Sequence, residues 1–425
     1  MSWRPPTKHR GMLSIDGAQH RDLRTGRAPW TSGPRPPRRP LDRDRRCDVL
    51  VVGAGITGAL VAERLVREGH DVCIVDRERP GLGSTAASTA MLLWEIDRPL
   101  ASLTDLYGFE RAARIYRRSL QAVRDLQSLV EQRQSACRMR ARNSLYLAAG
   151  TTDAHALMKE HELRARAGLP GHFLDYQTLR REFGIDREAA LLSPGAADAD
   201  PVCLAHGLTN RAVDGGAHLF DADAVHYDTG GRRTAVVMDD GDSIEADWIV
   251  LATGYVMPDF VASEIHRVTT TWAVATPPQP RRSCWPGEAL IWEASERYLY
   301  LRTTSDDRIV VGGGDDDAIT EPDDRASATP DKSQFLLAGL HRLLPDAEAC
   351  AQTAWSGVFG TTADGLPLIG PVPGHPRILA AYGYGGNGIT FGFIAAQLIA
   401  GMIGGRCAVW YDDFPVGRPL PSALR

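Results

Sequence analysis

Metal-binding and disulfide patterns are missing from this chain. Its seven cysteines are scattered and odd in number, and no two of them form a CxxC pair. Its twelve histidines show neither HxH nor HExxH spacing. Scattered, unpaired cysteines are typical of proteins in a reducing compartment, and zinc sites need clustered ligands. We therefore expect a cytoplasmic protein without disulfides and without a metal.

Long apolar runs are also missing. The longest, residues 388–403, is short for a bilayer and contains Gln397, so we expect a buried helix and no membrane span. The first residues lack the apolar core of a secretory signal. The net charge of −5 gives no general case for binding nucleic acid. With 425 residues and 43% apolar residues, the chain is large enough for two domains or one large composite.

The charge is unevenly distributed along the chain. Residues 1–46 carry 12 Lys and Arg against 4 Asp and Glu, and they are rich in proline. This segment lacks hydrophobic periodicity, so we expect an irregular basic arm, and a docking tail is the alternative. Lysine itself is rare, with three lysines against 45 arginines, and none lies between Lys159 and Lys332.

Residues 48–76 contain the most informative pattern. An apolar strand at 49–52 leads into the glycines Gly53, Gly55 and Gly58, then an amphipathic helix at 56–68 and a strand that ends at Asp76. The glycines allow a tight turn, close approach of a pyrophosphate, and close packing of helix on strand. The helix N-terminus favours phosphate, and the acid can bind a ribose. This unit predicts a dinucleotide site but does not distinguish FAD from NAD.

Further segments carry a resemblance to a known family. Residues 81–97, 298–313 and 365–400 join 48–76 and 248–254 in an order that resembles the D-amino-acid oxidase type of FAD-dependent oxidoreductase. This group contains the glycine, sarcosine and dimethylglycine oxidising enzymes. The resemblance spans nearly the whole chain after residue 46, and it implies FAD rather than NAD.

The expected fold is α/β, or an α+β composite. A discontinuous Rossmann-like FAD-binding domain (47–135, 198–265 and 353–410) is expected to hold an inserted, mostly antiparallel substrate domain (136–197 and 266–352). The basic arm (1–46) precedes them, and a tail (411–425) follows. The insertion is expected because the buried strand at 248–251 lies about 200 residues after the first strand, yet belongs to the same sheet.

A second glycine cluster supports the flavin independently of the resemblance. Gly383, Gly385, Gly386 and Gly388 open a helix more than 325 residues after the first turn, whereas an NAD fold closes its site within one contiguous block. Backbone N–H groups near residues 387–389 are expected to stabilise the negative charge of a reduced flavin.

The residues expected to bind FAD come from several places in the chain. No His or Cys occurs at 81–90 or 383–393, so the covalent attachment seen in some relatives is not expected, and FAD should be noncovalent. The expected contacts are Gly53, Gly55, Ile56, Thr57, Gly58, Asp76, Arg77, Gly83, Ser84, Thr85, Ser88, Thr89, Gly254, Gly385, Gly386, Asn387, Gly388, Ile389 and Thr390.

The strand at 298–302 is expected to contact the substrate. Alternation places Tyr298, Tyr300 and Arg302 on one face. The resemblance implies that the arginine ending this strand holds a substrate carboxylate, and a guanidinium fork fits a carboxylate. A surface arginine that closes a strand is the alternative. The candidates Trp272, Trp292, His266 and Glu95 are weaker, and core or structural roles suit them equally well.

The expected reaction is oxidation of an amino acid or secondary amine. Hydride passes from the carbon next to a neutral amine to flavin N5, and the imine then hydrolyses, so no strong base is needed. The acceptor is O2 or another oxidant. Some relatives activate oxygen with a lysine, and the gap between Lys159 and Lys332 favours a dehydrogenase or an oxidase that uses another cation. Alternatives are oxidation of a hydroxy acid or polyol phosphate, and a partner-dependent flavoprotein. An oligomer is compatible with the sequence.

Overall fold

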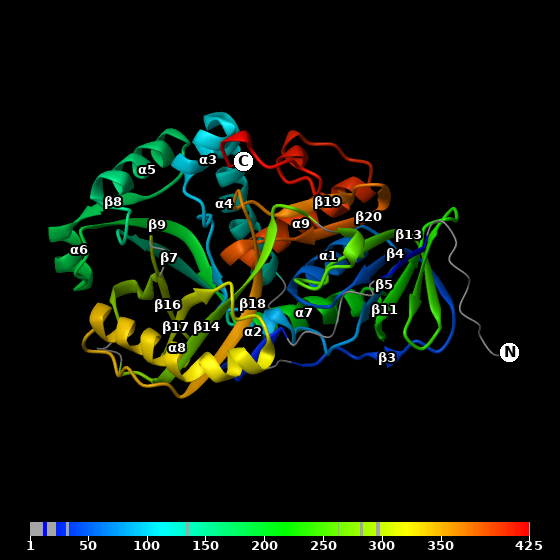
Figure 1. The fold of residues 1–425 in the computed structure, drawn as a ribbon, viewed down its shortest axis with the longest axis horizontal. Helices are drawn as coiled ribbons and strands as arrows, with labels where there is room; N and C mark the ends of the chain where they lie inside the picture. The colour runs from blue at the N-terminus through cyan, green and yellow to red at the C-terminus, as the bar shows by residue number, and fades with distance from the viewer. Residues whose placement is uncertain are drawn as a thin grey trace.

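The computed structural model describes residues 12–14, 23–30, 34–132, 136–261, 263–280, 284–294 and 298–424. Within these residues two large mixed sheets lie side by side, with helices packed against both (Figure 1). The chain crosses between the sheets several times, so each sheet is assembled from segments that are distant in sequence. This confirms the expected α/β class and the interrupted nucleotide-binding sheet.

The first sheet is built around parallel strands from three regions of the chain. Its strand order is β1-β11-β12-β13-β4-β5-β10-β3, and β20 pairs with β13 and β19. Pairing is parallel along β20, β13, β4, β5, β10 and β3. The bounds are β1 (Met12–Ser14), β3 (Arg39–Pro40), β4 (Arg45–Val52), β5 (Val72–Asp76), β10 (His218–Asp221), β11 (Ala224–Asp228), β12 (Thr234–Met238), β13 (Ser243–Leu251), β19 (Leu368–Val372) and β20 (His375–Tyr382).

Strand β4 shows why the centre of this sheet is apolar throughout. Val49 and Val51 belong to the core cluster that contains helices α1, α4 and α9, whereas Leu50 and Val52 belong to the cluster on the opposite face. Side chains alternate between the two faces of a strand, and both faces are covered here. A continuous apolar run is therefore what this position requires.

The second sheet is nearly all antiparallel. Its order is β2-β18-β14-β17-β16-β15-β7-β9-β6, β8 pairs with β9, and only the pairing of β15 with β7 is parallel. The bounds are β2 (Arg24–Gly26), β6 (Met91–Leu92), β7 (Arg140–Leu147), β8 (His172–Asp175), β9 (Ala189–Asp198), β14 (His266–Pro278), β15 (Leu290–Glu293), β16 (Leu299–Thr303), β17 (Arg308–Asp316) and β18 (Thr353–Thr362). Strand β18 belongs to this sheet, so the chain returns to the first sheet at β19.

The helices pack in two groups. Helices α1 (Ile56–Arg67), α4 (Phe109–Gln132), α7 (Pro201–Asp214) and α9 (Gly388–Ile403) cover the first sheet, and α1 contacts both α7 and α9. Helix α8 (Pro322–Leu343) covers the second sheet. The remaining helices are α2 (Ser84–Ala87), α3 (Leu100–Tyr107), α5 (Ala154–Arg166) and α6 (Tyr176–Phe183).

Helix α9 is apolar enough to be compared with a membrane span. Together with its preceding turn it forms a 19-residue stretch, Gly385–Ile403, whose length and composition would allow it to cross a membrane. However, 72% of its most apolar 18 residues are buried inside the protein. The burial is what a core helix shows, as expected for the apolar run at 388–403.

Three features differ from the sequence-based expectations. Periodicity predicts a helix at 332–344, but α8 begins ten residues earlier, at Pro322, which suits the first turn of a helix, and it continues through Pro330. The strand β9 was not expected. The arm at 1–46 is more ordered than expected: its described parts contribute β1, β2 and β3 as strands of the two sheets, while residues 1–11, 15–22 and 31–33 lie outside the described residues.

Candidate functional site

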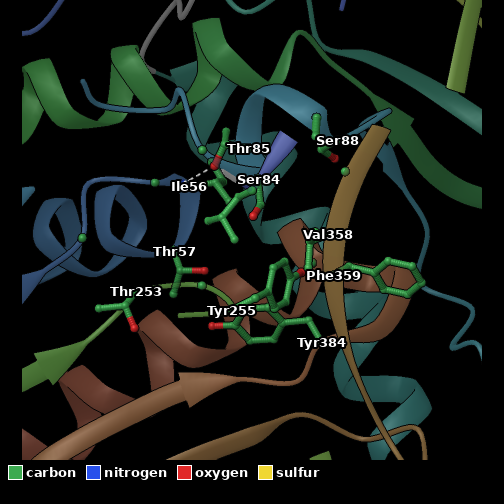
Figure 2. A pocket seen from close by; sticks show the side chains of 18 of the residues that line it. Ile56, Thr57, Ser84, Thr85, Ser88, Thr253, Tyr255, Val358, Phe359 and Tyr384 are labelled. Carbon is green, nitrogen blue, oxygen red and sulfur yellow. Dashed lines mark hydrogen bonds between the residues drawn. The ribbon is translucent and has the colours of Figure 1, made fainter. Parts of the chain in front are cut away.

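A long cavity is lined by residues of both sheets and brings together chain regions far apart in sequence. Its walls include the turn after β4, the loop at 81–91, the turn after β13 and the turn before α9. Figure 2 shows Thr57, Ser84, Thr253 and Tyr384 around this one cavity. The two glycine clusters, predicted from sequence to converge, therefore do so.

The first glycine turn is fixed by backbone contacts. Gly53 has a φ of 103° and donates its N–H to the carbonyl of Val75 at 2.8 Å. A Cβ on Gly58 would lie 1.8 Å from the carbonyl oxygen of Gly53, whereas one on Gly55 would meet only the Oγ1 of Thr85, at 3.3 Å. Gly58 is thus required for packing of α1 on the turn, and Gly55 leaves its backbone open to the cavity.

Asp76 both holds this turn and lines the cavity. Its Oδ2 accepts the N–H of Ala54 at 2.6 Å, and its Oδ1 accepts the N–H of Glu78 at 2.8 Å. Burial raises the pKa of Asp76 to about 6. Asp223 and Tyr227, beyond the end of the neighbouring β10, line the same end of the cavity. An acid in this place can accept hydrogen bonds from ribose hydroxyls.

The loop at 81–91 closes over the turn. Thr85 accepts the N–H of Ile56 through its Oγ1 at 2.9 Å, the bond drawn in Figure 2. Ser84, Ser88 and Thr89 also line the cavity, as expected. The segment 23–30, by contrast, was not expected here: Leu23 lines the cavity and its carbonyl accepts the N–H of Val358 at 3.0 Å.

The second glycine turn lines the same cavity, close to the start of α1. Gly388 and Ile389 begin α9 and line the cavity, and the first N–H groups of a helix have no partner within it. The Asn387 side chain donates instead to the carbonyls of Leu93 and Glu95, at 3.3 and 2.8 Å. Thr390 likewise donates to Leu93 at 2.8 Å. These two side chains fix the turn, and the backbone faces the cavity.

Most of the predicted cofactor residues line this cavity. The ones that do are Gly53, Gly55, Ile56, Thr57, Asp76, Arg77, Gly83, Ser84, Thr85, Ser88, Thr89, Gly254, Gly385, Gly386, Asn387, Gly388 and Ile389. The structure gives Gly58 and Thr390 supporting positions behind the lining, as described above.

Arg302 is the main correction. It is buried and is not part of the cavity lining. Its Nη1 donates to the carbonyls of Thr89, Ala90 and Ala199, at 2.9, 2.8 and 2.9 Å. Alternation did place it on the face of Tyr298 and Tyr300, but it lies farther along β16, beneath the loop. Its guanidinium binds backbone carbonyls of the protein, so it is not positioned to hold a substrate carboxylate.

An aromatic compartment occupies the part of the cavity formed by the second sheet. Tyr298 and Tyr300 line it, with ring centroids 5.8 Å apart. Trp292 also lines it and stacks on Tyr146 at 3.8 Å. The Tyr298 hydroxyl donates to Oδ2 of Asp315 at 2.8 Å. Tyr298 and Tyr300 were predicted from the alternation along residues 298–302, and Trp292 was one of the two tryptophans among the weaker candidates.

Asp97 was missed, although it lies in a segment that was singled out. Its side chain is accessible to solvent because it lines the open cavity. The cavity itself lies within the protein, so Asp97 is still surrounded by protein atoms. Its Oδ2 accepts the N–H of Gly386 at 2.6 Å. Burial, with a smaller contribution from the charge of Asp315, raises its pKa to about 6. The feature of the sequence that could have identified Asp97 is its position two residues after the candidate Glu95, in the segment that follows the cofactor loop.

The other candidates have structural positions. Glu95 is buried away from the cavity, with its Oε1 3.8 Å from Nη1 of Arg164. Trp272 is buried beneath Lys332, whose Nζ lies 4.5 Å from its ring and donates to Gly314 and Asp316. His266 packs edge-on against Tyr382. In the part of the chain that the structure describes, no group of three or more His, Cys, Asp or Glu side chains is placed to hold a metal.

The cavity suits a dinucleotide that carries a flavin. Its lining offers an acid beside Ala54, a glycine turn that leads into a helix N-terminus, and a second glycine turn with a second helix N-terminus. Phosphates favour the first helix start, and an anionic ring edge favours the second. A nicotinamide dinucleotide would leave the second turn unexplained.

Comparisons with known proteins agree with this reading. The model of the family FAD dependent oxidoreductase (DAO) matches residues 48–402. Gamma-glutamylputrescine oxidoreductase of Escherichia coli (strain K12) is 25% identical over 400 residues, covering 89% of this chain and 90% of the relative. Glycine oxidase of Geobacillus kaustophilus (strain HTA426) is 24% identical over 381 residues, covering 84% and 93%.

Solved structures show the same fold. The crystal structure of glycine oxidase from Geobacillus kaustophilus has a TM-score of 0.74 at 21% identity, over 88% of this chain and 100% of that one. Iminodiacetate oxidase from Chelativorans sp. BNC1 has a TM-score of 0.67 at 23% identity, over 86% and 98%. Because the family model spans most of the chain and the cavity has the required parts, this protein belongs to the FAD dependent oxidoreductases, and its cofactor is FAD.

Proposed function

We propose that this protein oxidises an amine by removing a hydride from the carbon next to nitrogen. The observation that carries the proposal is that the FAD-binding turns and the aromatic compartment share one cavity. The amine and amino-acid substrates named for the relatives support it, since gamma-glutamylputrescine and glycine each carry an amine.

FAD, when bound, supplies an acceptor for both electrons of the substrate C–H bond. The chain then has three tasks. Tyr298, Tyr300 and Trp292 enclose the substrate, which orients its reacting carbon, and they also exclude water. The first N–H groups of α9, at Gly388 and Ile389, stabilise negative charge at their end of the cavity.

The nitrogen must be uncharged when the hydride leaves. A protonated amine first gives its proton to a carboxylate or to water, and its lone pair then forms the C=N bond as the hydride departs. Water hydrolyses the resulting iminium to a carbonyl compound and free amine. Asp97, with a pKa of about 6, is ionised at neutral pH and is the acidic side chain placed to take this proton through its Oδ1 or Oδ2.

Anaerobic reduction of the purified yellow protein tests this proposal. Amines and amino acids added in turn should bleach the flavin absorption for at least one compound with a C–H bond next to an amine nitrogen. Reduction by hydroxy acids alone would instead favour the alternative alcohol chemistry.

The exposed thiols of Cys350 and Cys407 fit a reducing compartment, so we expect the protein in the cytoplasm.

A further inference from the structure

The charge of the aromatic compartment points to the class of amine. The charged side chains among the described residues that line the cavity are Asp76, Arg77, Glu78, Asp97 and Asp223. Asp76 ends β5, Arg77 and Glu78 follow it, and Asp223 lies just beyond the neighbouring β10, so these four are at the end assigned to adenosine. At the compartment end, the described lining therefore presents a carboxylate, that of Asp97, and no cation.

Two further observations agree with this charge. Asp315 accepts a hydrogen bond from the Tyr298 hydroxyl through its Oδ2 at 2.8 Å, and it adds a second acidic group close to Asp97. The rings of Tyr298, Tyr300 and Trp292 line the same compartment. Aromatic faces attract cations, and a carboxylate beside them strengthens this preference.

We propose, building on the amine oxidation above, that the compartment takes a protonated amine without a carboxylate on its reacting carbon, and that Asp97 pairs with the ammonium group. The cavity separates such a substrate from an α-amino acid by charge. An α-carboxylate placed beside Asp97 would bring two negative charges together in a site partly shielded from water, whereas an ammonium group meets its counter-ion.

The position of Asp97 also places the ammonium group beside the part of the cavity assigned to the flavin. Asp97 Oδ2 accepts the N–H of Gly386, in the turn that precedes α9. The carboxylate is thus fixed beside the part of the cavity assigned to the flavin ring. A cation held there lies next to both the acid and the flavin, and after loss of its proton to Asp97 it becomes the neutral amine that the reaction needs.

Two probes that cannot be oxidised test the preference without relying on turnover. Tetramethylammonium and acetate are added separately to the FAD-loaded protein, and binding is followed by the perturbation of the flavin spectrum. We expect saturable binding of tetramethylammonium that is at least about tenfold tighter than that of acetate. Tighter binding of acetate, or no saturable change with tetramethylammonium, would overturn the proposal.

Asp97→Asn is the matched variant, because the amide oxygen can still accept from Gly386. Asp346→Asn, which removes one negative charge from an exposed position outside the cavity lining, is the control. With equal FAD content, Asp97→Asn should weaken tetramethylammonium binding by about tenfold or more, and the control should not. Equal binding by Asp97→Asn would remove Asp97 from the site.

The flavin-reduction panel keeps this inference separate from the proposed function. Diaminobutane and butylamine are compared with glycine, sarcosine and D-alanine. Reduction by the amino acids but not by the amines would preserve amine oxidation and refute the cationic class. Failure of every compound to reduce the flavin would count against the proposed function, while the probe titrations would still decide the charge preference.

Discussion

Single residues determine what the cavity can bind. Gly55 and Gly58 belong to one turn, yet an added Cβ would meet a side-chain oxygen at 3.3 Å in the first case and a backbone oxygen at 1.8 Å in the second. Asp97 and Arg302 show the same dependence on position, since one opens into the cavity and the other is buried beneath it. Residue type alone did not separate these roles.

The two glycines should fail in different ways. Gly55→Val should fold and lose FAD, because its side chain projects toward the place of the pyrophosphate. Gly58→Ala should lower the free energy of unfolding by about 1–3 kcal/mol, because the turn must shift. Thermal unfolding of the FAD-free proteins and FAD titration distinguish them; a Gly55→Val variant that loads fully with FAD would contradict the assignment of this turn.

Arg302 should matter for stability rather than for substrate. Arg302→Met removes a charged donor from three backbone carbonyls, and we expect a loss of about 3–5 kcal/mol in the free energy of unfolding, because the carbonyls keep no partner in its place. Arg181→Met, at an exposed position, is the control. Urea unfolding measures the loss. A stable Arg302→Met variant with selectively weakened binding of carboxylate substrates would restore the original assignment.

Asp97 should give the enzyme an acid limb in its pH profile. Burial raises its pKa to about 6, so the carboxylate gains a proton as the pH falls through this value and no longer attracts an ammonium group. We expect kcat/KM for an amine to fall below about pH 6, and this limb to be absent in Asp97→Asn. An unchanged limb in the variant would assign it to another group, such as Asp76, whose pKa is also raised to about 6.

At the scale of elements, the segment of β2, which lies outside the two predicted domains, contributes to the wall of the site. Strand β2 pairs with β18 at the edge of the second sheet, with Trp355 opposite Gly26. Trp30, on the same segment, lies edge-on to Trp355 at 6.4 Å and over the guanidinium of Arg302 at 5.1 Å. The segment 23–30 therefore contacts the cavity at Leu23 and, through Trp30, the Arg302 side chain that holds the loop at 81–91.

Removing this segment should loosen FAD. A chain that begins at residue 31 lacks β2 and Leu23, and we expect FAD to dissociate about tenfold faster or more, as lost apolar contacts of a Leu side chain imply. A chain that begins at residue 23, which lacks β1 but keeps Leu23 and β2, is the control. Dissociation is followed by fluorescence of released flavin, and equal rates for both truncations would show that the segment does not retain FAD.

At the scale of the whole molecule, local patterns predicted the cofactor half better than the substrate half. The unit 48–76 is built from contacts between neighbouring segments, so its strand, turn and helix follow from periodicity and glycine spacing. Strand β9, the partnership of β18, and the place of Arg302 depend on pairing with distant strands, which one sequence does not specify. The place of Asp97 in the cavity could not be predicted, because its contact with the turn at Gly386 joins segments almost 290 residues apart.

The convergence of the two glycine turns on FAD is the central claim, and hydrogen exchange of the FAD-free and FAD-loaded protein tests it most directly. Peptides that cover residues 53–58 and residues 385–390 should both become protected when FAD binds, because both contribute backbone N–H groups to one cavity. Protection of the first turn with no change in the second would contradict the account.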